Sequence, residues 1–282
     1  MYQEFSDAIR AAGLIPPDTL TTGKIIAFAG LNKPKTNKAA RCFLFPDRRG
    51  GWFMDYSTGL FAVWQQHRHR PYSEQEREAF RQQCQQDRLA REQAQRDGHR
   101  TAAQKAHAIY RRAIFADAGN PYLQRKQIQP HGTKTGDSGS LKNVLIIPLY
   151  NPALKRVNLQ FIQPDGTKRF LTGGQKRGCF WWLGKKTDTV LIAEGFATAA
   201  SLYQHTRQQT FIAFDAGNLS NVAQTVRAQH PAADLIIMGD HDPSGTGQQA
   251  ARAAALASGG KYLIPPTPGH DWNDAINAGA IL

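Results

Sequence analysis

The most regular pattern in the chain is an alternation of short apolar runs with amphipathic segments over residues 185–282. Short apolar runs of this kind are typical of strands that are buried on both faces, and the segments between them have helical spacing. Strands that alternate with helices predict right-handed crossovers and a mainly parallel sheet covered on both faces. The predicted strands are 189–193, 210–214, 234–239 and 261–264, and the predicted helices are 196–206, 219–229, 246–258 and 272–278.

Three further parts are predicted before this α/β domain. Residues 1–66 begin with a short helical pattern and continue as a small β-rich module. Residues 72–118 are predicted to form a helical connector, and residues 119–184 a small mixed α/β subdomain. The predicted strands are 24–28, 41–45 and 51–56 in the module, and 143–150, 156–162 and 168–171 in the subdomain.

The connector is rich in Gln, Arg, Glu and Ala, a composition typical of exposed helices. Two capping-box patterns, Ser73 with Glu76 and Thr101 with Gln104, predict two helices separated near Gly98. The arginines of the first helix suit either contacts with nucleic acid or a solvated face that carries opposite charges. The second helix is expected to bury Ile109, Tyr110 and Ile114.

Charge and composition limit the class of protein. The chain has 282 residues, 41% of them hydrophobic, which is enough for one large or two medium domains. Lys and Arg number 35 against 22 Asp and Glu, so the expected partner is a polyanion, nucleic acid first. No signal pattern and no membrane-length apolar run is present in the sequence, which predicts a soluble cytoplasmic protein without a membrane partner. The three widely spaced cysteines favour neither a disulfide framework nor a zinc site.

Positive charge and aromatic residues alternate in the module at residues 1–66. Phe53, Tyr56, Phe61 and Trp64 could stack with bases while nearby cations contact phosphates. A small aromatic core with a solvated basic loop explains the same residues. The candidate nucleic-acid contacts in the module are Lys33, Lys35, Lys38, Arg48 and Arg49.

Carboxylates follow two of the predicted parallel strands. Glu194 comes directly after the first strand of the α/β domain, and Asp240 and Asp242 come directly after the third. Ligands in open α/β sheets bind outside the carboxyl ends of the strands, and Mg²⁺ or Mn²⁺ prefers carboxylate oxygens. The small residues after Asp242 would let phosphate oxygens approach the next helix. This arrangement predicts a divalent metal site.

Three more acids could complete the site or cap helices. Asp215 also follows a predicted strand, and its alternative role is a helix cap. Asp271 and Asp274 follow the last strand with capping-box spacing, so a site role and a capping role both remain open. His241 lies between two candidate ligands, yet hard metals seldom use imidazole, and a hydrogen bond within the loop is expected instead.

These residues resemble a known family. Glu194-Gly195 followed by Asp240-His241-Asp242 is similar to the Toprim domain, and residues 194–201 (EGFATAAS) resemble the EGYATA motif of phage and conjugative-plasmid primases. Residues 120–126, 146–149 and 165–171 are similar to the segment that precedes Toprim in replicative primases. The resemblance implies a Rossmann-like, Toprim-type α/β sheet after a primase-like subdomain. It also places residues 1–66 where such primases carry a zinc ribbon, here without the cysteine ligands.

The resemblance implies roles for individual residues. Glu194 would be a general acid/base or a metal-bridging carboxylate, and Asp240 and Asp242 would hold Mg²⁺ or Mn²⁺. Lys168 and Arg169 would face nucleotide phosphates, as their charges also allow. Replicative primases often carry another acid four residues beyond the motif glutamate, where this chain has Thr198. Arg125 and Lys126, in the same upstream segment, are expected to contact nucleic acid.

The expected function is therefore that of a DNA primase. Such an enzyme would make short oligonucleotides from nucleoside triphosphates on a single-stranded DNA template and pass them to a separate helicase or polymerase. Two alternatives remain at this point: a metal-dependent Toprim nuclease, and a non-catalytic single-stranded-DNA-binding protein of a mobile element.

Overall fold

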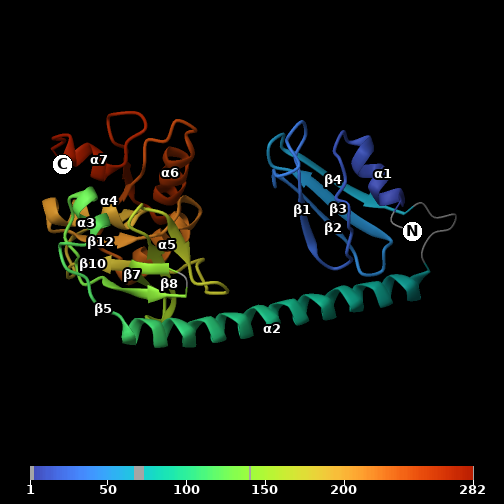
Figure 1. Ribbon diagram of the computed structural model, residues 1–282, viewed down its shortest axis with the longest axis horizontal. Helices are drawn as coiled ribbons and strands as arrows, with labels where there is room; N and C mark the ends of the chain where they lie inside the picture. The colour runs from blue at the N-terminus through green and yellow to red at the C-terminus, as the bar shows by residue number, and fades with distance from the viewer. Residues whose placement is uncertain (1–2, 67–72, 140, 282) are drawn as a thin grey trace. The chain divides into compact units, whose positions relative to one another are not determined.

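A computed structural model describes residues 3–66, 73–139 and 141–281 of the chain (Figure 1). The chain divides into two compact units, Met1–Gln83 and Cys84–Leu282, which are considered separately below. In the described ranges, no helix combines the length and the apolar character needed to cross a lipid bilayer.

Unit 1 is a four-stranded antiparallel sheet with a helix on one face. The sheet runs in the order β1 (Ile25–Phe28), β2 (Ala40–Leu44), β3 (Gly50–Asp55) and β4 (Leu60–Gln65). Phe5 and Ile9 of α1 (Gln3–Ala11) are fully buried against one face of the sheet. The predicted helix and three strands are confirmed, and β4 is a further strand that the alternation of exposed and half-buried residues at 60–65 explains.

α2 (Glu74–Arg112) is a single helix of 39 residues, so the predicted division into two helices is wrong. A glycine inside a helix costs only about 1 kcal/mol relative to alanine, and the surrounding Gln, Glu, Arg and Ala favour the helix. Gly98 therefore does not end it, and Thr101 is an interior residue. The first capping box is confirmed, because Ser73 N donates to Glu76 Oε2 at 2.9 Å and Glu76 N donates to Ser73 Oγ at 3.2 Å.

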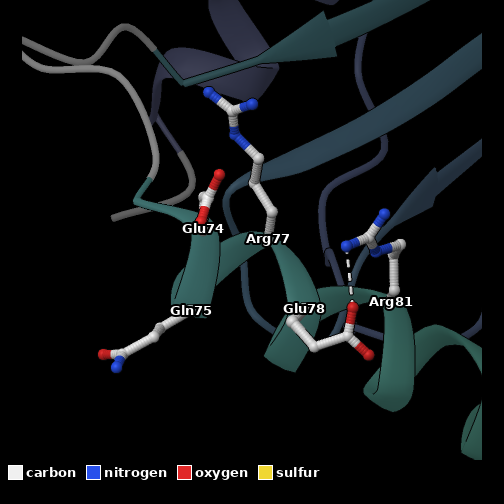
Figure 2. A pocket seen from close by; sticks show the side chains of 5 residues that line it. All are labelled: Glu74, Gln75, Arg77, Glu78 and Arg81. Atoms are coloured by element: carbon white, nitrogen blue, oxygen red, sulfur yellow. Dashed lines mark hydrogen bonds and ion pairs between the residues drawn. The ribbon is translucent and has the colours of Figure 1, made fainter.

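The first turns of α2 carry opposite charges side by side. Figure 2 shows the shallow hollow that Glu74, Gln75, Arg77, Glu78 and Arg81 line. Arg81 Nη2 lies 2.7 Å from Glu78 Oε2, and both side chains are more than half exposed. Exposed pairs of this kind stabilise a helix only slightly, and they leave little net charge for binding nucleic acid. This stretch is a solvated helix face.

A second antiparallel sheet lies in unit 2, and α2 packs on it. Its order is β5 (Ile114–Phe115), β6 (Lys134–Ser138), β7 (Leu141–Tyr150), β8 (Arg156–Ile162) and β9 (Lys168–Phe170). Ala106, Ile109 and Tyr110 of α2 pack against the β7 and β8 residues of one face. Ile114 was predicted to join them, but it lies in the edge strand β5 and is exposed. The helix ends at Arg112, so Ile114 no longer follows the helical spacing.

The remaining sheet of unit 2 is the predicted α/β sheet, and this fold class is confirmed. Its order is β10 (Trp181–Leu183), β12 (Gln209–Ile212), β11 (Thr189–Ala193), β13 (Asp234–Met238) and β14 (Lys261–Leu263). All neighbours are parallel except β10, an antiparallel edge strand that the sequence did not predict. Its helices are α4 (Phe196–Thr206), η1 (Ala216–Asn218), α5 (Leu219–Gln229), α6 (Thr246–Ser258) and α7 (Trp272–Asn277).

Helices cover both faces of this sheet. α4 and α7 pack on one face together with part of the antiparallel sheet and α3 (Pro121–Lys126), whereas α5 and α6 pack on the other (Figure 1). Along β11, Leu191 and Ala193 belong to the first core and Val190 and Ile192 to the second. Burial on both faces explains why the strands are continuously apolar.

Candidate active site

The strand order brings three predicted acids to one edge of the sheet. β11 lies between β12 and β13, and Ala193 pairs with Ile212 on one side and Met238 on the other. Glu194 follows directly, with the β12 end on one side and the β13 end on the other. The chain leaves β11 toward β12 through α4 and leaves β13 toward β14 through α6, on the opposite face. Such a reversal opens a crevice at the carboxyl ends of the strands, where ligands bind.

Glu194 is half-buried at the centre of this edge. Burial raises the pKa of its carboxyl group, and the negative charges of Asp242 and Asp215 add to the effect, while the Lys168 ammonium opposes it. The backbone is fixed as well, because Phe214 N donates to the Glu194 carbonyl at 2.7 Å. A carboxyl group with a raised pKa can both accept and release a proton near neutral pH.

Asp240 carries the strongest electrostatic signal in the site. Burial raises its pKa to about 7, and the charges of Glu194, Asp271 and Asp242 contribute in the same direction. Its Oδ1 atom is buried and has no hydrogen-bond partner. A buried carboxylate oxygen without a donor, surrounded by other acids, is costly unless a cation binds beside it.

Asp242 is held by the loop that leads into α6. Gly247 N donates to Asp242 Oδ2 at 2.9 Å, so the carboxylate lies at the positive end of that helix. A Cβ atom on Gly247 would lie 2.6 Å from the Asp240 carbonyl oxygen and 3.0 Å from Asp242 Oδ2. Only glycine lets the loop wrap this closely around both acids.

Lys168 reaches the site from the antiparallel sheet, but Arg169 does not. A Cβ atom on Gly195 would lie 3.5 Å from Lys168 Nζ, and the ammonium lowers the pKa of Glu194. Lys168 pairs with Ile162, whose side chain belongs to the core shared with the α/β sheet. Adjacent strand residues point to opposite faces, so Arg169, paired with Phe161, lies on the face that α2 covers. The predicted basic pair is thus divided between two faces.

Asp215 is paired with a cation that the sequence analysis missed. Lys176 Nζ lies 2.7 Å from Asp215 Oδ2 and 5.2 Å from the centre of the Phe170 ring. The Asp215 side chain makes no capping hydrogen bond to η1. Asp215 is therefore neither a simple helix cap nor an unpaired metal ligand. Lys176 lies in an irregular loop 39 residues before Asp215, and no local sequence signal marks this pairing.

Asp271 and Asp274 form the capping box of α7. Asp274 N donates to Asp271 Oδ1 at 2.9 Å, and Asp271 N donates to Asp274 Oδ2 at 3.3 Å. Lys126 Nζ lies 3.6 Å from Asp271 Oδ2 and 3.1 Å from Asp274 Oδ1. Asp271 contributes charge beside Asp240, but its carboxylate is already engaged.

Lys126 is therefore paired with acids of the fold, and its expected contact with nucleic acid stays a prediction. Its two carboxylate partners join α3 to α7. Arg125 is exposed and lies over the Tyr122 ring at 5.5 Å, with its guanidinium donating to the Pro164 carbonyl. His241 makes a hydrogen bond to a loop, but to the one that follows β14 and not to its own, since its Nδ1 lies 2.8 Å from the Pro265 carbonyl oxygen.

The acids at this sheet edge could hold a divalent cation while leaving some of its coordination positions to other ligands. In the part of the chain that the structure describes, no three Asp, Glu, His or Cys side chains converge closely enough to form a closed metal site. Glu194, Asp240 and Asp242 nevertheless supply hard oxygen donors and uncompensated charge at one point of the sheet edge. Mg²⁺ is typically bound by one or two carboxylates and keeps water or phosphate oxygens in its other positions.

Comparisons with known proteins agree with this geometry. The family model of the Toprim domain matches residues 189–280. A curated Escherichia coli protein named DNA primase TraC is 34% identical over 188 residues, which is 62% of this chain and 18% of that protein. A second E. coli DNA primase TraC is 38% identical over 157 residues, which is 51% of this chain and 11% of that protein. The chain thus spans less than a fifth of the length of either relative.

Among solved structures, the primase fragment of the bacteriophage T7 primase-helicase protein is similar, with a TM-score of 0.45 and 14% identity. That similarity covers 59% of this chain and 74% of the fragment. The sequence comparisons identify the domain that carries the acids: residues 189–280 match the Toprim domain, and the chain is similar in sequence to part of the DNA primases TraC.

Proposed function

We propose that this chain is the catalytic part of a DNA primase that makes short oligonucleotides on single-stranded DNA. One observation carries the proposal: Glu194 and Asp240 meet at the crevice of a Toprim sheet, within the field of Lys168. A cation beside buried acids suits a substrate that carries both phosphates and a metal. Nucleoside triphosphates, the DNA template and a separate helicase or polymerase are the proposed partners.

The proposed reaction joins two nucleotides. The 3′-hydroxyl oxygen of one attacks the α-phosphorus of the next, a new P–O bond forms, and pyrophosphate leaves. Glu194 accepts the hydroxyl proton, a role that its raised pKa allows. Lys168 contacts the phosphates as a point charge. Asp240 and Asp242 would hold Mg²⁺ or Mn²⁺, which when bound supplies charge neutralisation at the reacting phosphate.

A template-dependent synthesis assay tests this function. Purified protein is incubated with single-stranded DNA, labelled nucleoside triphosphates and Mg²⁺ or Mn²⁺, and product length is measured. We expect short products that Glu194→Gln reduces at least about 100-fold. Asp188→Asn is the matched control, because Asp188 is exposed just before β11 and should leave synthesis unchanged.

Other outcomes point to other functions. Metal-dependent shortening of the template, without incorporation of nucleotides, would identify a nuclease that uses the same acids. Binding of DNA that persists in Glu194→Gln, with no reaction in the wild type across many templates and both metals, would contradict any catalytic function.

A further inference from the structure

Within residues 3–66 and 73–83, the part of unit 1 that the structure describes, no helix covers one face of the sheet. The strand registers place two rows of side chains on this face: Ile25 beside Phe43, Trp52 and Val63, and Ala27 beside Arg41, Met54 and Phe61. The alternate residues point to the other face, where α1 packs and the core lies. The eight residues of these two rows are called the open face below.

Large apolar side chains of the open face are exposed to solvent. Ile25, Phe61 and Val63 are 62%, 61% and 69% exposed. The rings form a continuous stack across three strands, with Phe43 and Trp52 centred 6.0 Å apart at 17° and Trp52 and Phe61 6.3 Å apart at 28°. Exposed apolar patches are typical of binding surfaces.

The aromatic residues of this module divide between the two faces, so the base-stacking and aromatic-core alternatives each apply to some of them. Phe53 is buried in the core and Trp64 packs against Phe5 of α1, so both lie on the side of the sheet that α1 covers. Trp52, which the sequence analysis did not select, lies in the ring stack of the open face. Successive side chains of β3 point to opposite faces, so Trp52 points to the open face and Phe53 to the core.

Charge on and around the open face is positive. Arg41 is its one charged residue, and its guanidinium lies 5.8 Å from the centre of the exposed Tyr56 ring. Residues 24–66 contain seven Lys and Arg against two Asp, a balance of +5. One of those acids, Asp55, is buried on the other face and accepts hydrogen bonds from Leu31 N and Ser57 N. The cations on the adjoining loops are Lys33, Lys35, Lys38, Arg48 and Arg49.

We propose that the open face binds single-stranded DNA, with bases stacked on Trp52 and Phe61 and phosphates near Arg41 and the basic loops. Single-stranded nucleic acid combines exposed planar rings with a regular negative charge, and both features match this surface. A second copy of the chain would match the apolar rings but would bring two basic surfaces together. The proposal extends the proposed function, since it names where a template would be held.

Binding of a fluorescein-labelled single-stranded oligonucleotide to the full chain tests this surface, by anisotropy in EDTA and without nucleotides. Phe61→Ala should raise Kd about tenfold, because one stacked ring is lost. Val63→Glu should raise Kd at least as much by placing a carboxylate on the open face, and Val63→Gln should raise it less. Both side chains are mostly exposed, so these variants should fold, which circular dichroism and the unfolding midpoint verify.

Phe80→Ala is the matched control, because Phe80 is an exposed phenylalanine of the same unit on α2. It should leave Kd within about twofold. Equal Kd values for wild type, Phe61→Ala and Val63→Glu would overturn the proposal. So would variants that change only the oligomeric state measured by sedimentation, because the open face would then be a contact between copies of the chain. Loss of DNA binding in these variants with no primer synthesis by the wild type would support the open face and contradict the primase function instead.

Discussion

The Toprim sheet and the sheet of unit 1 differ in how they are covered, and this difference bears on the function proposed for each. The Toprim sheet is buried on both faces, so chemistry is confined to its edge, where carboxylates emerge from a desolvated strand end. The sheet of unit 1 is buried on one face only, and its other face presents rings to solvent. Burial of a sheet on both faces shifts the pKa values of carboxyl groups at its strand ends, which favours catalysis. Burial on one face only leaves exposed surface area on the other, which favours binding.

The largest expected effect separates the two surfaces by function. Glu194→Gln should lower primer synthesis at least about 100-fold, because it removes the proposed proton acceptor. The same variant should leave the anisotropy Kd for single-stranded DNA within about twofold. A parallel loss of synthesis and binding would show that the sheet edge and the open face do not act separately.

The next effect concerns stability and pH. The pKa of Asp240 is raised to about 7 in the folded chain, so the folded state binds a proton more tightly than the unfolded state. The contribution of Asp240 to the free energy of unfolding is therefore most favourable below pH 4. It falls by about 2 to 4 kcal/mol as the pH rises from about 4 to 7. Urea unfolding of wild type and Asp240→Asn across this range, in EDTA, measures the difference.

Asp240→Asn should flatten this pH dependence and be more stable than wild type at pH 8. Saturating Mg²⁺ or Mn²⁺ should recover about 2 to 3 kcal/mol in the wild type only, because a cation compensates the buried charge. A pH dependence that is identical in both proteins would mean that Asp240 is not the titrating group.

A smaller effect tests which cation belongs to the site. Lys168→Ala should raise KM for nucleoside triphosphates about tenfold, because its ammonium lies beside Gly195. Arg169→Ala, its neighbour on the α2 face, should change KM much less. Steady-state synthesis rates distinguish the two, and equal effects would contradict the division of this pair.

The smallest effect concerns the continuity of α2. Gly98→Ala should raise the free energy of unfolding by up to about 1 kcal/mol, because alanine favours a helix and a Cβ atom there would meet nothing within 4 Å. Urea unfolding measures the change. A decrease in stability would instead support a helix break at Gly98.

Sequence alone predicted the Toprim sheet well because double burial leaves an unambiguous pattern. Strand 189–193 and helix 196–206 were predicted with the observed bounds, and the Ser73–Glu76 capping box formed as expected. Predictions from single residues failed where the neighbouring residues favour a different structure. Gly98 is a weak helix breaker among strong helix formers, and the structure continues through it.

The candidate site was predictable only in part. Parallel strand ends must meet at one edge, so Glu194 and Asp240 could be placed together. The partners of the other acids are distant in sequence: Lys176 binds Asp215, and Lys126 binds Asp274 from 148 residues away. No local pattern encodes such pairs. The separation of Lys168 from Arg169, by contrast, follows from strand alternation and could have been anticipated.

The central place of β11 also affects how the protein can lose activity. Its backbone is hydrogen-bonded to a strand on each side, and its residues are buried in both cores. Such a strand opens to solvent last, so its amide protons should exchange with deuterium only when the whole unit unfolds. Fraying of an edge strand would leave Glu194 in place. The proposed catalytic carboxylate would then be attached to the part of unit 2 that is expected to exchange most slowly.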